Sequence, residues 1–153
     1  MHIPPPIFPA GAPKPPEHPE ARFCLAVLLN ARNEILLLRR ALDDGFAPGQ
    51  WGLPGGHIQD PESPVATILR ELDEEIGGAV NLQALQRVGP VGDTGYGGIY
   101  EVHIFLFRYE GGPIVLNEEH DALAWVAQHD YPGYHVVKGI DEDLRYLEVW
   151  QEP

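Results

Sequence analysis

The segment Gly56–Gly78, GHIQDPESPVATILRELDEEIGG, decides how this sequence is interpreted. Four acidic side chains crowd into five consecutive positions of it, namely Glu71, Asp73, Glu74 and Glu75, and Arg70 is the basic residue beside them. Like charges at helical neighbour spacing repel each other, and anions near a helix C-terminus oppose the helix dipole. The carboxylates are therefore either fully solvated or share a counter-charge. A divalent cation is one such counter-charge, because hard cations take oxygen ligands.

Apolar residues of the segment recur with the period of an α-helix. At 100° per residue, one stripe of the helix surface holds five of them: Val65, Ile68, Leu69, Leu72 and Ile76. Residues 60–63 contain helix-starting side chains, and Gly77 and Gly78 are typical of a helix end. The pattern predicts a helix between these two signals.

The acidic residues of this helix fall on another arc. Glu71, Glu74 and Glu75 are spaced i, i+3, i+4, so their side chains converge. We expect Glu75 to be partly desolvated at the margin of the apolar stripe, and Asp73 to face solvent. A solvated acidic helix face would produce the same local composition, so the acids alone do not decide between solvent and a cation.

The wider sequence pattern favours the cation over solvent. From Gly56 onward the segment follows G-x5-E-x7-R-E-U-x-E-E-x-G, where U is a bulky aliphatic residue. This resembles the signature of the Nudix hydrolase family, the MutT-like pyrophosphohydrolases. Gly78 departs from it, since the family usually has an aliphatic residue there. The segments Trp51–Gly56 and Ile35–Arg40 also resemble family elements, and the resemblance covers roughly residues 21 to 150.

The resemblance implies a fold and an activity. The fold is α+β: the Nudix α/β/α sandwich, a mixed β-sheet flanked by helices. The activity is hydrolysis of a nucleoside diphosphate linked to another moiety, with Mg²⁺ or Mn²⁺ as cofactor. Oxidised or ordinary nucleoside triphosphates are the leading substrate, and nucleotide sugars, ADP-ribose and dinucleoside polyphosphates are alternatives. A catalytically silent nucleotide-binding regulator is a rival that three intact glutamates argue against.

Site residues are carried over by position. Glu71, Glu74 and Glu75 match the metal-binding glutamates, and the loop carbonyl of Gly56 matches a further ligand. Arg70 is expected to hold these carboxylates in place. In the family an additional catalytic or metal-binding acid often lies in a later loop, where Glu119 is the candidate and a plain surface acid is the alternative.

Substrate contacts are less sharply indicated. Gly55 lets the backbone approach a ligand closely, because glycine lacks a side chain. Arg39 has the reach to contact a phosphate, and a merely exposed arginine at a strand end is the alternative. Glu101 and His103 share one face of an apolar strand, where they line the pocket or where His103 is simply a hydrogen-bonded interior histidine. Base stacking has four candidates, each of which also suits the core: Trp51, Tyr96, Tyr100 and Trp125.

Composition narrows the function classes. The formal net charge of −13 argues against a nucleic-acid polymer or an anionic membrane as the main partner. It permits a small nucleotide, because a bound metal inverts the local charge. A single cysteine, Cys24, excludes an internal disulfide framework. Without a signal pattern or a bilayer-length apolar run, a cytoplasmic location is expected.

The domain prediction separates residues 1–20 from residues 21–153. Eight of the sixteen prolines lie in the first twenty residues, which predicts a flexible arm. An alternative is docking of this arm on a second subunit in a homodimer. The remainder is predicted as one domain with strands over these ranges: 23–29, 34–40, 51–53, 82–91, 99–109 and 122–127. A weak helical period follows over 141–150.

Overall fold

The computed structural model describes residues 1–150. Its regular elements follow in this chain order: β1 (Ala21–Leu29), β2 (Ile35–Arg40), β3 (Trp51–Gly52), β4 (Gly55–His57), α1 (Pro64–Ile76), β5 (Leu82–Gly92), β6 (Tyr100–Tyr109), β7 (His120–Val126), a 3₁₀ turn (Tyr131–Gly133) and α2 (Ile140–Tyr146). The strands form one sheet in the order β3-β2-β1-β6-β5, with β4 paired to β1 and β7 paired to β2. Since β1 and β6 are parallel and the other pairs are antiparallel, the sheet is mixed, as predicted.

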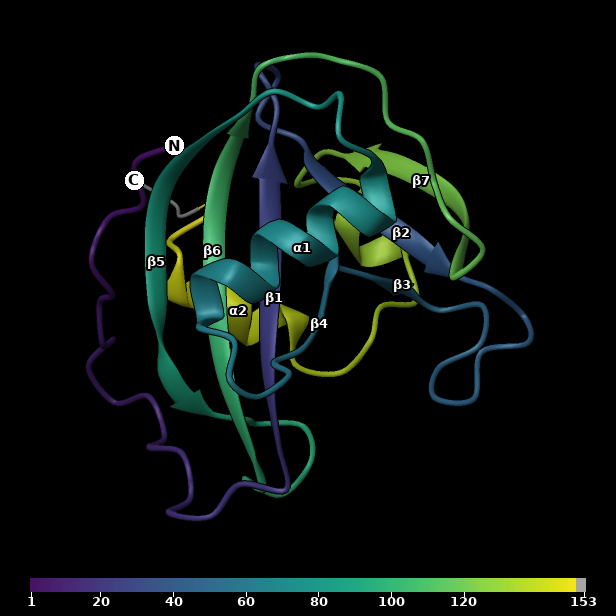
Figure 1. Ribbon diagram of the computed structural model, residues 1–153. Coiled ribbons are helices and arrows are strands. Elements are labelled where there is room, and N and C mark those ends of the chain that lie inside the picture. Colours follow the sequence, from purple (N-terminus) through teal and green to yellow (C-terminus); the bar gives the residue numbers. More distant parts are fainter. Residues whose placement is uncertain (151–153) are drawn as a thin grey trace.

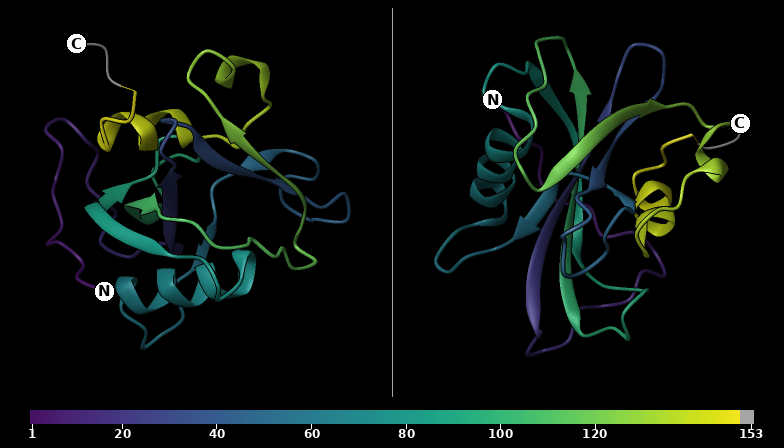
Figure 2. Two further views of the ribbon diagram at one scale, coloured as in Figure 1. Left: turned by 90° about the horizontal axis from the view of Figure 1, so that it is seen from above. Right: turned by 90° about the vertical axis from the view of Figure 1, so that its right-hand side faces the viewer.

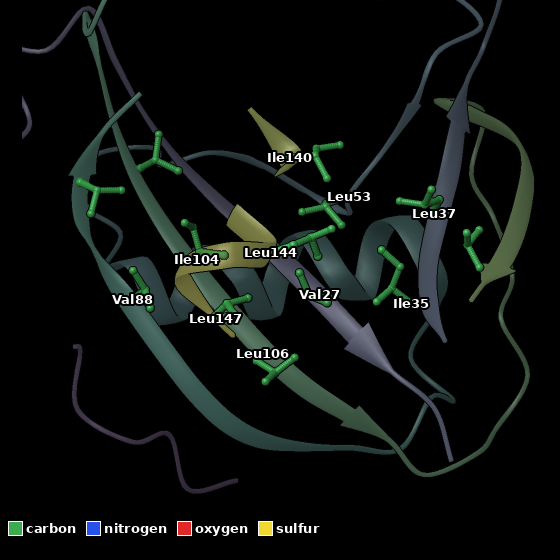
Figure 3. Close-up of a cluster of buried hydrophobic side chains, with 13 residues drawn as sticks. Val27, Ile35, Leu37, Leu53, Val88, Ile104, Leu106, Ile140, Leu144 and Leu147 are labelled. Atoms are coloured by element: carbon green, nitrogen blue, oxygen red, sulfur yellow. The ribbon is translucent and has the colours of Figure 1, made fainter. Parts of the chain in front are cut away.

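The two helices cover opposite faces of the sheet (Figures 1 and 2). Helix α2 and its C-terminal residue contribute Ile140, Leu144 and Leu147, which pack on one face of the sheet. Figure 3 shows the buried cluster that results. A second cluster joins α1 to the other face. Alternate residues of β6 enter each cluster, Ile104 on one side and Phe105 on the other. The expected α/β/α sandwich is thus confirmed, and β6 is covered on both faces.

Helix α1 starts and ends as the sequence predicts. The side chain of Ser63 accepts a hydrogen bond from the Ala66 N–H at 3.1 Å, which caps the first turn. At the other end, the Gly77 N–H donates to the Asp73 carbonyl at 3.2 Å. Each buried aliphatic side chain on the sheet side contributes about 1.5–3 kcal/mol: Ile68, Leu72 and Ile76.

One expectation for α1 is wrong. The period predicts Leu69 on the buried stripe, yet this residue is 39% exposed, while Thr67 is fully buried. The buried arc is centred near Ile68, so Leu69 lies 100° away at its edge. This rotation of the helix brings Glu71 and Glu75 towards the sheet, and both are buried.

The structure also adds a strand that the sequence did not predict. β4 lies beside β1, with Cys24 opposite Gly56 and Leu25 opposite Gly55. Two glycines in three residues are unfavourable for a strand, so its pattern carried no strand signal. A Cβ at Gly55 would lie 2.1 Å from the carbonyl oxygen of Cys24, so only glycine permits this close pairing.

The proline-rich segment, residues 1–20, follows the outer edge of β5 (Figure 1). The Ile7 N–H donates to the Arg87 carbonyl at 2.8 Å, and the Gly92 N–H donates to the Pro13 carbonyl at 2.8 Å. Ile7 and Phe8 keep more than half of their surface exposed. The flexibility of this arm and its docking on a second subunit stay predictions, and residues 151–153 of the predicted domain lie outside the described residues.

Helix α2 is shorter than the predicted range of 141–150, because Leu147 already ends it. Neither α1 nor α2 of residues 1–150 reaches the length and apolarity that crossing a bilayer requires.

Candidate functional site

A cavity of about 640 Å³ opens where α1, β4 and several loops meet. One wall carries the carboxylates and glycines that the sequence singled out: Gly55, Gly56, Glu71, Glu75 and Glu119. The facing wall comes from the loop after β5 and from the start of α2. The volume of the cavity lies in the usual range for small-molecule sites. The cavity is therefore the candidate active site.

Glu71 lies directly against Gly56. A Cβ placed at Gly56 would meet the Glu71 carboxyl group at 2.5 Å, so a side chain there would displace the carboxylate. Burial raises the pKa of Glu71, while the nearby Arg70 guanidinium works in the opposite direction. Because Gly56 has no side chain, the Glu71 carboxylate can occupy this position in the cavity wall.

Glu75 is the most deeply buried acid of the cluster, with 3% of its surface exposed. One carboxylate oxygen accepts a hydrogen bond from the Gly55 N–H at 2.8 Å. Burial, which this bond only partly offsets, raises the pKa of Glu75 to about 9. The nearest partner able to carry positive charge on its second oxygen is His120, at 4.0 Å. A buried carboxyl group of this kind is suited to a cation that the folded protein binds from solution.

Arg70 connects the carboxylates at the rim. Its guanidinium contacts Glu62 at 2.7 Å, Glu71 at 2.9 Å and Glu74 at 3.4 Å. The hydrogen bonds from Arg70 lower the pKa of Glu62 to about 2. Arg70 and Glu74 do not line the cavity itself, and Glu74 is exposed beside it. Arg70 is thus paired with Glu71 and Glu62, and its expected role of holding the carboxylates in place stays a prediction.

Glu119 comes from the loop before β7 and reaches the same cavity. Together with Glu75 and His120 it places three potential ligand atoms within 4.8 Å of one another. Carboxylate oxygens suit Mg²⁺ and Mn²⁺, so the residues present fit a divalent cation. Burial lowers the pKa of His120 to about 4, which leaves its ring neutral near pH 7.

Three residues outside the predicted set also line the cavity: Arg40, Asp44 and Phe46. Because Phe46 is exposed, we call this part of the cavity its mouth. Arg40 donates to Asp44 at 2.7 Å and lies over the ring of Phe46, 5.5 Å from its centroid. This hydrogen bond lowers the pKa of Asp44 to about 2. Phe46 in turn packs on Tyr96, with ring centroids 5.7 Å apart, and Tyr96 lies 5.8 Å from Tyr100. The mouth therefore offers a guanidinium and aromatic surface.

The far wall holds a buried acid. Asp143, on α2, is 8% exposed, and burial raises its pKa to about 8. Lys138 and Tyr146 line the same end. Beside them, the Asp93 side chain accepts hydrogen bonds from the N–H groups of Tyr96 and Tyr100 and fixes the connecting loop. Asp143, Lys138 and Tyr146 thus add polar groups to the lining of the same cavity.

Three residues predicted for substrate contact lie away from the cavity. Arg39 pairs with Asp121 at 2.6 Å on the neighbouring strand β7. His103 is buried and shares a 2.9 Å hydrogen bond with Glu101, which also pairs with Arg22 at 2.7 Å. The two residues thus pair in the interior through His103 Nε2, while His103 Nδ1 is without a hydrogen-bond partner among residues 1–150.

Of the four aromatic candidates for base stacking, Tyr96 and Tyr100 line the cavity. Trp51 instead packs on Tyr134, and Trp125 packs on Tyr109.

Sequence reasoning missed Arg40, Phe46, His120 and Asp143. Period-2 alternation along β2 does distinguish Arg39 from Arg40, because neighbours in a strand point to opposite faces. Which face meets the cavity depends on long-range packing, and no local signal gives it. Phe46 and Asp143 lie in segments whose local pattern carries no site signature.

Comparison with known proteins agrees with this geometry. Residues 18–147 match the family model described as the NUDIX domain. The nucleoside triphosphatase NudI of Klebsiella pneumoniae (strain 342) is 30% identical over 122 residues, which cover 74% of this chain and 86% of that protein. The human 8-oxo-dGDP phosphatase NUDT18 is 30% identical over 131 residues, or 81% of this chain and 38% of that protein.

A solved structure shows the same fold. The MutT protein of Methanosarcina mazei Go1 superposes with a TM-score of 0.63 at 24% identity, covering 90% of this chain and 99% of that one. Family model, relatives and cavity geometry agree, and the chain therefore belongs to the Nudix family and is a Nudix pyrophosphohydrolase, a hydrolase acting on phosphoanhydride bonds.

Proposed function

We propose that this enzyme hydrolyses nucleoside triphosphates, ordinary or oxidised, with Mg²⁺ or Mn²⁺ as cofactor. One observation carries the proposal: Glu71 and Glu75 are both buried in the wall of a nucleotide-sized cavity, and within residues 1–150 no arginine or lysine forms an ion pair with Glu75. Buried carboxylates are retained where they bind a cation or perform chemistry. The relative NudI, a nucleoside triphosphatase, supports the triphosphate class, and the relative NUDT18, an 8-oxo-dGDP phosphatase, supports an oxidised nucleotide.

Glu71, Glu74 and Glu75 would hold the cation, with Glu119 facing them from the loop before β7. The Gly56 carbonyl remains a candidate ligand beside Glu71. When bound, the cation supplies neutralisation of phosphate charge and a more acidic water. Glu74 is exposed next to Arg70, so a rotation of its side chain joins it to the set.

The other residues bind and orient the substrate. Arg40, at the mouth, suits contact with a phosphate, and the surface formed by Phe46, Tyr96 and Tyr100 suits a nucleobase. Arg70 keeps Glu71 in place through a fixed ion pair. Gly55 orients Glu75 through its N–H group. Each of these groups is in position before substrate binds, which lowers the reorganisation that hydrolysis requires.

A panel of nucleotides tests the proposal. Metal-stripped protein is incubated with nucleoside triphosphates, 8-oxo-purine nucleotides, ADP-ribose, a nucleotide sugar and a dinucleoside polyphosphate, each with Mg²⁺, Mn²⁺ or EDTA. Products are separated by ion-exchange chromatography. We expect triphosphates to release a nucleoside monophosphate when Mg²⁺ or Mn²⁺ is present and not in EDTA. Turnover of ADP-ribose or a nucleotide sugar alone would contradict the proposed substrate class. Equal turnover in EDTA would contradict the proposed metal dependence.

A further inference from the structure

Strand β7 begins with an irregularity beside the cavity. In its pairing with β2, Leu38 lies opposite Leu123 and Arg39 opposite Ala122, but Arg40 lies opposite His120. Asp121 is therefore an extra residue on β7, a β-bulge. Its side chain is fixed outside the ladder by the 2.6 Å hydrogen bond from Arg39.

The bulge changes the direction of one side chain. Successive residues of a strand point to opposite faces, so an extra residue reverses the alternation. Leu36 and Leu38 of β2 face α1, and Arg40 shares their face. Because His120 pairs with Arg40, its ring turns towards the α1 side, where Glu75 lies. A regular ladder would have placed Asp121 opposite Arg40. Bulges next to active sites commonly re-aim a side chain in this way.

The imidazole of His120 is left with an unsatisfied atom. Its side chain is 3% exposed, and in the described part of the chain, residues 1–150, Nδ1 has no hydrogen-bond partner. A buried polar atom without a partner is unfavourable and rare, and an ion or water is one explanation. Nδ1 points at the carboxylate of Glu75, 4.0 Å from Oε1. A single cation bound by both groups would give the nitrogen a partner and the buried carboxylate a counter-charge.

We propose that His120 Nδ1 is a direct ligand of a divalent cation that it shares with Glu75 and Glu119. Ligand atoms from the three residues lie within 4.8 Å of one another. Two ligands about 2.2 Å from one ion lie up to about 4.4 Å apart, so a shift of a few tenths of an ångström closes the site. Three protein ligands leave positions free for water and phosphate oxygens.

This ligand set has a consequence for metal choice. Mg²⁺ takes oxygen ligands and tolerates little distortion, whereas imidazole nitrogen suits transition-metal ions. A site with one nitrogen therefore favours Mn²⁺ over Mg²⁺. The inference rests on the proposed metal-dependent function and deepens it, since it adds a nitrogen ligand and a metal preference to the glutamate site.

Pulsed EPR of bound Mn²⁺ tests the nitrogen ligand directly. Echo-envelope modulation is recorded on metal-stripped full-length protein loaded with one equivalent of Mn²⁺, without nucleotide. We expect modulation from a directly bound nitrogen, which changes isotope pattern when the protein is labelled with ¹⁵N-histidine. His120→Asn places an oxygen near the position of Nδ1 and should abolish the modulation. His57→Gln should retain it, although His57 lines the cavity, and so should His129→Gln at an exposed histidine.

Affinity gives a second measurement. His120→Asn should weaken Mn²⁺ binding about tenfold or more, in the range seen when groups around a metal are altered. It should leave Mg²⁺ binding within about threefold, because an oxygen now replaces the nitrogen. A melting curve of the variant confirms that it is folded.

Two results separate this inference from the proposed function. Wild-type protein that binds Mn²⁺ and hydrolyses triphosphates, but shows no histidine nitrogen modulation, overturns the role of His120 and leaves the function intact. Wild-type protein that shows no saturable Mn²⁺ binding overturns both.

Discussion

Glu75→Gln should make the metal-free protein more stable while it abolishes metal binding. The Glu75 carboxyl is almost completely buried, and its pKa is raised to about 9 in the folded protein. In the unfolded chain the same group titrates near 4.5. Between these values the unfolded state is ionised and the folded state must retain a proton, so folding loses stability with each pH unit gained.

The size of the effect follows from this difference. At pH 7.5 the carboxyl lies about three pH units above its unfolded pKa, which costs up to about 4 kcal/mol at 1.36 kcal/mol per unit. At pH 5 the same cost is below about 1 kcal/mol. Glutamine is neutral and its oxygen still accepts the Gly55 N–H, so the variant avoids the cost. We expect its melting temperature to exceed wild type by about 5–10 °C at pH 7.5 in EDTA.

Differential scanning calorimetry from pH 5 to pH 8.5, with EDTA present, checks this prediction. The difference between variant and wild type should widen as pH rises and should narrow when Mn²⁺ is added, since only wild type is stabilised by the ion. Asp73→Asn is the matched control, because Asp73 is exposed on the same helix, and its effect should stay below about 0.5 kcal/mol. A Glu75→Gln protein less stable than wild type at every pH would refute the reasoning.

Three further substitutions test other parts of the site. Gly56→Ala should lower Mn²⁺ affinity about tenfold or more by calorimetric titration, because its Cβ would collide with the Glu71 carboxyl. Arg70→Lys should reduce kcat about tenfold with a melting shift below about 3 °C, since lysine lacks the fork that joins Glu62 to Glu71; unchanged kcat would end its positioning role. Asp143→Asn should raise the melting temperature by at least about 4 °C at pH 8 and little at pH 4.5, because burial raises the pKa of Asp143 to about 8.

The sequence predicts most of the helix that carries the site, because its information is local. The start at Ser63 and the end at Gly77 follow from short-range capping chemistry, and the structure confirms both. Helical periodicity also predicts that Glu75 is partly desolvated, but its almost complete burial depends on how the helix is rotated against the sheet. This rotation does not follow from the helix sequence, since it depends on how the apolar stripe meets the sheet. For that reason Leu69 was misplaced.

Strand residues were harder to assign than helix residues. A strand shows which side chains share a face, but the face that meets a cavity is set by distant elements. Arg40 therefore lines the cavity while Arg39 does not. His120 is harder still, since a bulge reverses its direction and no local pattern announces a bulge. Asp143 lines the cavity because α2 packs on the face of the sheet opposite α1, which no local pattern predicts (Figure 2).

The central claim is that the buried carboxylates of α1 hold a catalytic divalent cation in this cavity. Its most direct test is equilibrium binding of Mn²⁺, with free ion counted by its EPR signal, on wild type and on Glu71→Gln/Glu75→Gln. We predict saturable binding to the wild type and loss of that binding, together with triphosphate hydrolysis, in the double variant. Undiminished Mn²⁺ binding by a folded double variant would contradict the claim.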